Sequence, residues 1–271
     1  MGYNVHFQRF EFKYIITLAQ EKEIMERIGK YLCPDSYVKE SKTGYEVRSL
    51  YYDSPQFFYY DEKNDGVGLR KKIRLRCYGV DEESRNNVFF EIKRKNDAVV
   101  IKDRFLLSRD EYNKLISFDD LLFEELKKDS HRANVIEEFR CERGLRSIAP
   151  KVLVVYDRIP FLDRYNPSFR ITFDKNIRAA KTDDLFCDNK DLLDVFPDGV
   201  VMEIKFNGTM PFYIRGIIEF FDLQRTSFSK YCTAVDTCGA NSAFIFPYQN
   251  RLNNNLNFYS FNQSFYDGFN S

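Results

Sequence analysis

The sequence predicts an α+β domain built around an antiparallel sheet. The expected strands come in runs rather than in strict alternation with helices, which favours antiparallel pairing over a doubly wound parallel sheet. Aromatic residues make up 17% of the 271 residues, with 27 Phe and 18 Tyr, and this richness favours packed strands. No Pro/Gly/Ser-rich linker divides the chain, so we expect one domain over residues 1–249 and an Asn- and aromatic-rich tail over 250–271.

The expected strands are short alternating or β-branched runs bounded by turn residues. The first begins at Arg9, the polar stretch 81–87 joins two strands as a hairpin, and Asn207-Gly208 closes the last strand. In chain order, the strands are expected at 9–16, 47–52, 70–78, 88–95, 99–107, 152–159, 169–173 and 200–207.

Two capping boxes mark the starts of expected helices, because Thr17 is followed by Gln20 and Ser108 by Glu111. Pro34 should stop the first helix after about Leu32. The expected helices run from 18 to about 32, through 57–60 after Ser54-Pro55, from 109 to about 140 with a break near 129, and over 211–223.

Composition excludes several classes of protein. The 41 Lys and Arg balance the 41 Asp and Glu, so an overall basic polyanion binder is not expected. Two histidines are too few for a His-rich metal site or a His-based triad, and none of the six cysteines forms a CxxC pair. The sequence has neither an eighteen-residue apolar stretch nor a secretory signal, which predicts a cytoplasmic protein with free thiols.

Several expected strands carry charged side chains on one face and apolar side chains on the other, because successive strand residues alternate. In 72–77 the face of Lys72, Arg74 and Arg76 is entirely basic, and a Glu-apolar-Lys triplet recurs at 11–13, 91–93 and 203–205. A solvated face with cross-strand charge pairs would explain one such strand. Five strands of this kind predict a common charged surface instead.

A sheet closed with these faces inward would be a barrel with a polar, basic lumen and apolar faces packed outward against helices. Like charges repel strongly in a low dielectric, so the lumen should hold a multiply anionic ligand. Its carboxylates would suit Mg²⁺ or Mn²⁺, which prefer oxygen ligands and bridge phosphate oxygens. Cations around a phosphate-bound metal are typical of phosphoryl transfer.

Nine segments occur in the order found in a known family. They are RFEFKY at 9–14, SLYYD at 49–53, KIRLRCYG at 72–79, FFEIKRK at 89–95, IKDRF at 101–105, YDRIPF at 156–161, RITFD at 170–174, VMEIKF at 201–206 and FSKY at 228–231. With them the chain resembles the VTC-type polyphosphate polymerase domains of the triphosphate tunnel metalloenzyme (CYTH-like) superfamily. The resemblance implies an eight-stranded antiparallel tunnel, transfer of the ATP γ-phosphate onto a growing polyphosphate, and Mn²⁺ or Mg²⁺ as cofactor.

The resemblance also implies roles for individual residues. It gives catalytic roles to Lys13, Arg74, Arg76, Lys93, Arg158 and Arg170, and substrate-binding roles to Lys102 and Lys230, with Lys205 as their neighbour. Arg9, on the charged face of the first strand, is a further substrate-binding candidate. The family's metal-binding glutamate falls on Glu203, with Glu11 as a second metal-site residue. The wider superfamily opens with Glu-x-Glu-x-Lys, whereas this chain has Arg9 at the first position. That departure favours a more basic lumen suited to a long anionic product.

Two other functions stay open at this point. A hydrolase would use water as the acceptor, and a binding module for polyphosphate or inositol polyphosphates would not need Glu203. The expected partners are ATP and polyphosphate rather than nucleic acid. A membrane-protein partner and the oligomeric state are left open. The aromatic run 57–60 is expected in the core, with a stacking role for one of its tyrosines against adenine also open.

Overall fold

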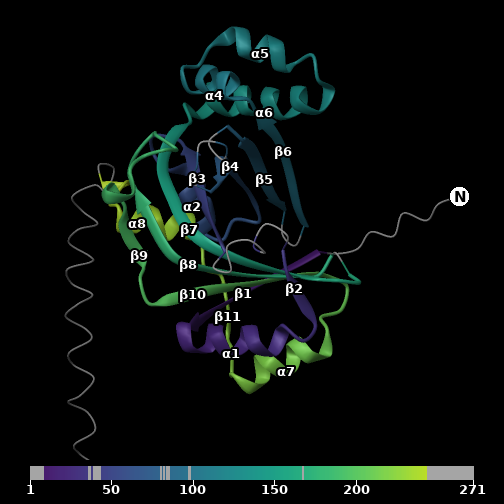
Figure 1. Ribbon diagram of the computed structural model, residues 1–271. Coiled ribbons are helices and arrows are strands. Elements are labelled where there is room, and N and C mark those ends of the chain that lie inside the picture. The colour runs from purple at the N-terminus through teal and green to yellow at the C-terminus, as the bar shows by residue number, and fades with distance from the viewer. Residues whose placement is uncertain are drawn as a thin grey trace, which may run out of the picture.

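The computed structural model describes residues 9–35, 38, 44–79, 81, 83, 86–96, 99–166 and 168–242. Within them one antiparallel sheet runs in the order β11-β1-β10-β8-β7-β3-β4-β5-β6, with β2 paired to β7 and β9 to β8 (Figure 1). The strands are β1 (Arg9–Thr17), β2 (Leu32–Pro34), β3 (Tyr45–Asp53), β4 (Leu69–Tyr78), β5 (Val88–Asn96), β6 (Val99–Leu107), β7 (Ala149–Asp163), β8 (Arg170–Ala180), β9 (Leu193–Phe196), β10 (Gly199–Asn207) and β11 (Arg225–Thr226).

Helices follow the capping signals of the sequence. Thr17 and Ser108 each form the predicted capping box, and Gly29 caps the first helix, so that Leu32–Pro34 pairs with β7 instead of extending it. The helices are α1 (Leu18–Ile28), α2 (Phe58–Asn64), α4 (Arg109–Ile116), α5 (Asp120–Leu126), α6 (Ser130–Arg146), α7 (Phe212–Phe220) and α8 (Lys230–Thr237), with a 3₁₀ turn at Asn189–Asp191.

The prediction of an eight-stranded closed barrel is wrong. The described residues form eleven strands, and no ladder joins β6 to β1. The two residues of β11 occupy the outer edge of β1 instead. The sheet nevertheless curls, because Lys93 on β5 donates to Glu11 on β1 over 3.1 Å, although these strands lie far apart in the strand order. Register shifts between β3 and β7 and between β7 and β8 add local bends to the curled sheet.

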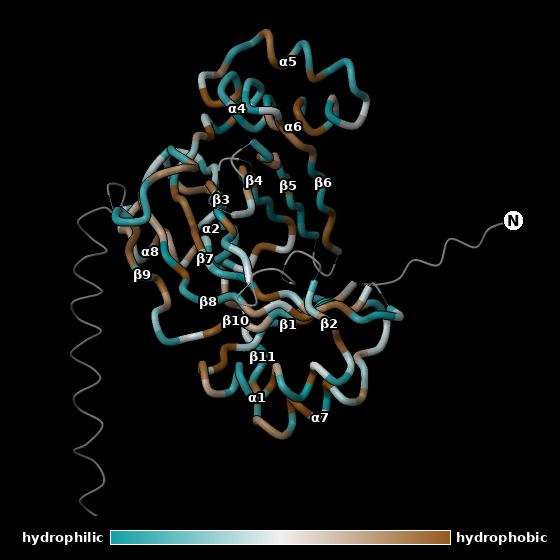
Figure 2. The backbone as a smooth tube through the Cα atoms, viewed as in Figure 1, coloured by the Kyte–Doolittle hydropathy of each residue, from teal (hydrophilic) through white to brown (hydrophobic). Residues whose placement is uncertain are grey.

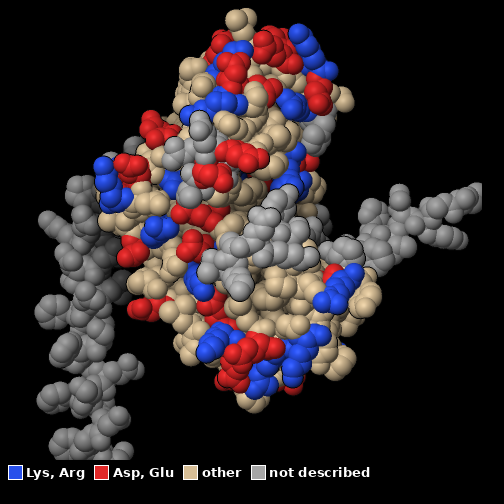
Figure 3. All heavy atoms as spheres, viewed as in Figure 1, with Lys and Arg blue, Asp and Glu red and all other residues tan. Residues whose placement is uncertain are grey.

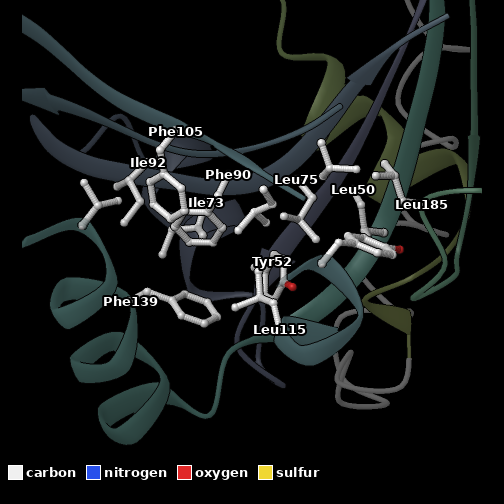
Figure 4. Close-up of a cluster of buried hydrophobic side chains, with 14 of the residues drawn as sticks. Leu50, Tyr52, Ile73, Leu75, Phe90, Ile92, Phe105, Leu115, Phe139 and Leu185 are labelled. Carbon is white, nitrogen blue, oxygen red and sulfur yellow. The ribbon is translucent and has the colours of Figure 1, made fainter. Parts of the chain in front are cut away.

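Helices cover the outer, apolar face of the curled sheet, as the alternation predicts. On one side α4 and α6 pack on β3–β6, where Phe90 and Ile73 meet Phe139 and Leu115 (Figure 4). On the other side α1 and α7 pack on β1, β10 and β8 (Figure 1). Charged and apolar residues alternate over 72–77 of β4 and 90–93 of β5, and a hydrophilic stretch lies in the middle of β6 (Figure 2), so the second face of β4 and β5 is polar.

The last helix, α8, was not expected from the sequence, and it packs on the inner side of the sheet. Tyr231, Cys232 and Val235 are buried among inner residues of β3, β7 and β8. Tyr231 stacks on Tyr51 of β3 with ring centroids 4.9 Å apart. This helix therefore closes one end of the inner face.

A buried carboxylate joins α8 to β3 and α2. Asp53 is fully buried and accepts the N–H groups of Ser54, Tyr59 and Tyr60 at 2.7, 2.9 and 3.0 Å, and the Tyr231 hydroxyl at 2.5 Å. The prediction that the aromatic run 57–60 lies in the core holds for Phe57 and Tyr59, whereas Phe58 is exposed and Tyr60 is half-buried, because successive helical side chains point in different directions.

Replacing this carboxylate should destabilise the protein strongly. Asp53→Ala would leave four buried donors without an acceptor, and we expect the free energy of unfolding to fall by at least about 3 kcal/mol. Chemical denaturation of this variant beside Asp61→Ala, an exposed carboxylate of α2, measures the difference. Equal stability of the two variants would contradict the conclusion that Asp53 holds α2 and α8 against β3.

Candidate functional site

Charged and hydroxyl-bearing side chains form a continuous inner face across the curled sheet. Cross-strand pairs such as Lys13 with Glu203, Arg158 with Asp174 and Arg74 with Glu91 put these residues on the same side of the sheet. Lys and Arg outnumber carboxylates there: the described members include Lys13, Lys72, Arg74, Arg76, Lys93, Lys102, Arg158, Arg170, Lys205 and Lys230, against Glu11, Glu91, Asp174 and Glu203.

Two carboxylates lie at the β1–β10 end of this face. Glu203 is 2.5 Å from the Lys205 amine and 3.8 Å from that of Lys13, and Glu11 is 3.1 Å from Lys93 and 3.6 Å from Lys13. Burial and the neighbouring Glu203 raise the pKa of Glu11, but the amines of Lys93, Lys205 and Lys13 outweigh them and lower it to about 2. Both carboxylates are therefore ionised at neutral pH.

A second group lies on β4, β5 and β6 around Glu91. The Arg74 guanidinium binds this carboxylate at 2.6 Å and also donates to the Tyr51 hydroxyl at 2.9 Å. Lys102 reaches the other oxygen of Glu91 at 2.6 Å, and its side chain is 34% exposed. Burial raises the pKa of Glu91, but Arg74, Arg76 and Lys102 reverse that effect and lower it.

A third group lies on β7, β8 and the first residue of α8. Arg158 donates two hydrogen bonds to Asp174, at 2.7 and 2.8 Å, and Lys230 contacts the same carboxylate at 2.7 Å. Asp174 is fully buried; its burial raises its pKa, but the two cations lower it to about 2. Lys230 thus reaches the inner face from α8, a helix that the sequence analysis did not predict.

Two inner cations have no carboxylate within 4 Å among the described residues. Arg76 is 5% exposed and donates only to neutral groups, the Ser49 hydroxyl at 2.9 Å and the Tyr156 hydroxyl at 3.2 Å. Lys72 donates to the Ser229 hydroxyl at 3.0 Å. Burial, opposed in part by Tyr51 and Cys232, lowers the pKa of Lys72 to about 8. Unpaired charge of this kind is costly, and an anion on the inner face would relieve it.

The structure brings together all predicted site residues whose side chains it describes. Arg170 is 3.9 Å from Asp35, and within the described part of the chain its Nε has no hydrogen-bond partner. Arg9 is the first residue of β1, and its side chain lies outside the described part of the chain. The prediction for Arg9 therefore stays open.

Sequence reasoning left several inner residues out of the candidate site. Lys72, Glu91 and Asp174 carry the alternation signal that picked out their neighbours, but they matched no role in the resembling family. The tyrosines Tyr51 and Tyr156 gave no signal, because an aromatic residue in a strand reads as apolar. Their hydroxyls accept from Arg74 and Arg76 respectively.

On the outer helices that Figure 3 shows, no excess of cations is visible. Figure 3 shows Lys and Arg intermixed with Asp and Glu over the outer helices. Among the described residues no three His, Cys, Asp or Glu side chains gather as a ready metal cage. Nor does any helix of the described chain have the length and apolar character needed to cross a lipid bilayer.

Comparison with protein families agrees with this geometry. The model of the VTC domain matches residues 8–238, which include the whole inner face. The chain belongs to the VTC-domain family. No curated protein sequence matches the chain.

Solved structures similar to this VTC domain share little sequence with it. One is an adenylyl cyclase candidate from Hippeastrum, described as having a dominant triphosphatase activity (TM-score 0.47, 12% identity, 88% of this chain and 98% of that chain). Another is an adenylate cyclase candidate from Bacillus halodurans (TM-score 0.45, 11% identity, 82% of this chain and 95% of that chain). A third is an adenylate cyclase candidate from Vibrio parahaemolyticus (TM-score 0.42, 12% identity, 84% of this chain and 97% of that chain). Identities this low do not carry an activity over to this chain.

Proposed function

We propose that this VTC domain is an ATP-dependent polyphosphate polymerase that works on the inner face of the curled sheet. The observation that supports it most is the pair of inner cations, buried Arg76 and half-buried Lys72, that have no carboxylate partner within 4 Å among the described residues. A chain of phosphates is the multiply charged, extended anion that such a face would neutralise. Membership of the VTC-domain family supports the same substrate class.

The reaction needs no protein nucleophile. A terminal phosphate oxygen of the acceptor forms a new P–O bond to the γ-phosphorus of ATP, the bond to the β-phosphate oxygen breaks, and ADP leaves. The protein's part is to align the two phosphates and to stabilise the charge on the transferring group. In our proposal Arg74, Arg76, Lys93, Arg158, Arg170 and Lys13 do this, while Lys102, Lys205 and Lys230 hold the rest of the substrate.

The carboxylates of Glu203 and Glu11 fit a divalent ion that takes its other ligands from substrate and water. Mg²⁺ is commonly held by one or two carboxylates together with substrate phosphates, and Mn²⁺ accepts the same ligands. Both carboxylates are ionised and lie on adjacent strands. When bound, the ion would neutralise developing charge on the phosphates. The two lysines beside Glu203 would orient its carboxylate.

A hydrolase is the second candidate, because the inner face is open to solvent. The Lys93 and Lys205 side chains are 32% and 24% exposed, so water reaches the region of the carboxylates. Water in place of the acceptor phosphate would release orthophosphate. The same cations would bind the ATP phosphates whether the acceptor is water or a phosphate.

A product assay separates these reactions. Purified protein is incubated with ATP and Mn²⁺, and the products are resolved on a gel that separates polyphosphate from orthophosphate. We expect a polyphosphate ladder together with ADP. Orthophosphate alone would replace the polymerase with the hydrolase, and bound ATP without turnover would replace it with a binding module.

Binding of a triphosphate should take up protons near pH 8. The pKa of Lys72 is about 8 in the free protein because of burial, and a bound anion favours the charged amine and raises it. Affinity should therefore fall as the pH rises from 7 to 9. Calorimetry in buffers of different ionisation enthalpy measures this uptake, with Lys72→Gln as the variant that should reduce it. Proton release, or affinity independent of pH, would contradict the placement of Lys72 at the anion.

A further inference from the structure

Three aromatic rings continue the inner face at the end away from α8; we call Tyr45, Tyr78 and Phe89 the aromatic shelf. The centroids of the Tyr45 and Tyr78 rings are 5.8 Å apart with planes at 80°, and those of Tyr78 and Phe89 are 5.8 Å apart at 70°. Tyr45 is six residues along β3 from Tyr51, which stacks on α8. The shelf and the closing helix therefore lie at opposite ends of the face.

The shelf is directly joined to the cations of the proposed site. Tyr45 is the cross-strand partner of Arg158, and Phe89 is that of Arg76. The Arg76 guanidinium lies 6.0 Å from the centre of the Tyr78 ring. Because a strand rises about 3.3 Å per residue, Arg76 and Arg74 lie roughly 7 and 13 Å from Tyr78 along the same face of β4. Along this face of β4, the Tyr78 ring is therefore followed by the guanidinium groups of Arg76 and then Arg74.

The backbone holds the first ring of the shelf firmly in place. Gly44 precedes Tyr45 with φ of +94°, and a Cβ there would lie 2.4 Å from the Arg158 carbonyl oxygen. Only glycine permits this approach of β3 to β7 without strain. The position of Tyr45 beside Arg158 is therefore built into the sheet.

Core packing accounts for only part of these rings. Tyr45 and Tyr78 pack against the buried cluster that includes Val47, yet both stay half-buried. In the outer layer Phe90 contacts Phe105 and Phe139, and all three are buried at 6% exposure or less. The three shelf rings are only half-buried, and they lie on the polar side of the sheet. Exposed ring surface beside cations is what a flat aromatic ligand with an anionic extension would cover.

We propose that the aromatic shelf binds the nucleobase of a nucleoside triphosphate whose phosphates extend along β4 toward Arg76 and Arg74. The inference rests on the proposed function, because it requires a triphosphate on the inner face. It adds that the nucleotide is held at both ends, with the base at the open end of the face and the γ-phosphate toward the carboxylates.

Calorimetry on the full chain without divalent metal tests the proposal with two probes, a non-hydrolysable β,γ-imido analogue of ATP and inorganic tripolyphosphate. Loss of a stacking ring typically weakens binding by about fivefold or more. Tyr78→Ala should therefore lower the affinity for the ATP analogue at least about fivefold and leave the affinity for tripolyphosphate unchanged. Tyr78→Phe, which keeps the ring, should bind both probes like the wild type.

The matched control is Tyr31→Ala, which removes an exposed ring that stacks on Tyr213 at the outer helices. It should leave both affinities unchanged. Equal losses for both probes in Tyr78→Ala, or no loss for either, would overturn the shelf as a nucleobase site. Should Tyr78→Ala fail to fold, Tyr78→Leu keeps apolar bulk without a ring, and its titration with tripolyphosphate reports on the fold. If the wild type binds neither probe, the proposed function itself fails.

Discussion

Glu203→Gln should abolish turnover while leaving the triphosphate bound. The glutamine keeps the shape of the side chain but cannot supply a charged oxygen to a divalent ion, and we expect turnover to fall at least about 100-fold. Glu203 lies beside the amines of Lys205 and Lys13, so the substitution also leaves the inner face more positive. Affinity for tripolyphosphate in the absence of metal should therefore stay equal or rise.

The measurements are a steady-state assay with ATP and Mn²⁺ and a titration with tripolyphosphate. Glu219→Gln, on the exposed side of α7, is the matched control and should behave like the wild type. Wild-type turnover in Glu203→Gln would show that the metal is held elsewhere. Loss of binding together with turnover would show that Glu203 maintains the inner face rather than a metal.

Arg76→Met should weaken triphosphate binding without weakening the fold. Arg76 is buried, donates to neutral hydroxyls and feels Glu91 only without direct contact, so replacing it breaks no ion pair in the free protein but removes a charged donor from a bound anion. A hydrogen bond to a charged group contributes about 1.5–3 kcal/mol, which predicts a loss of at least about tenfold in affinity. The melting temperature of the free protein should stay equal or rise, because methionine removes the unpaired charge.

Arg158→Met provides the contrast. This guanidinium is held by two hydrogen bonds to buried Asp174, which would keep only Lys230 after the substitution. Breaking a buried ion pair from one side typically costs about 3–5 kcal/mol, so this variant should lose stability as well as affinity. Thermal unfolding and calorimetry on both variants separate the two cases. A lower melting temperature in Arg76→Met than in Arg158→Met would contradict the unpaired state of Arg76.

The two faces of the strands could be predicted because a strand has a period of two residues. The rule put Lys72, Arg74 and Arg76 on one face of β4 and Ile73 and Leu75 on the other, and the structure agrees. It applies to any strand, whatever its partners. The inner face could therefore be identified from the sequence before its neighbours were known.

The closure of the sheet and the elements at its edge and end, β11 and α8, could not be predicted in the same way. Whether a sheet closes depends on long-range register and on what occupies the edge of its first strand, and two residues of β11 are too short a run to carry a periodic signal. The helix α8 has only eight residues, and its burial comes from tertiary contacts of Tyr231 with Tyr51 and Asp53. The arrangement of the aromatic shelf likewise depends on register between β3, β4 and β5.

A crystal structure of the protein with tripolyphosphate and Mn²⁺ tests the central claim most directly. We expect phosphates between Arg74, Arg76 and Arg158 on the inner face, with an anomalous manganese signal at Glu203. Phosphates bound only to the outer helices, or manganese away from Glu203 with the inner face free of phosphate, would contradict the account.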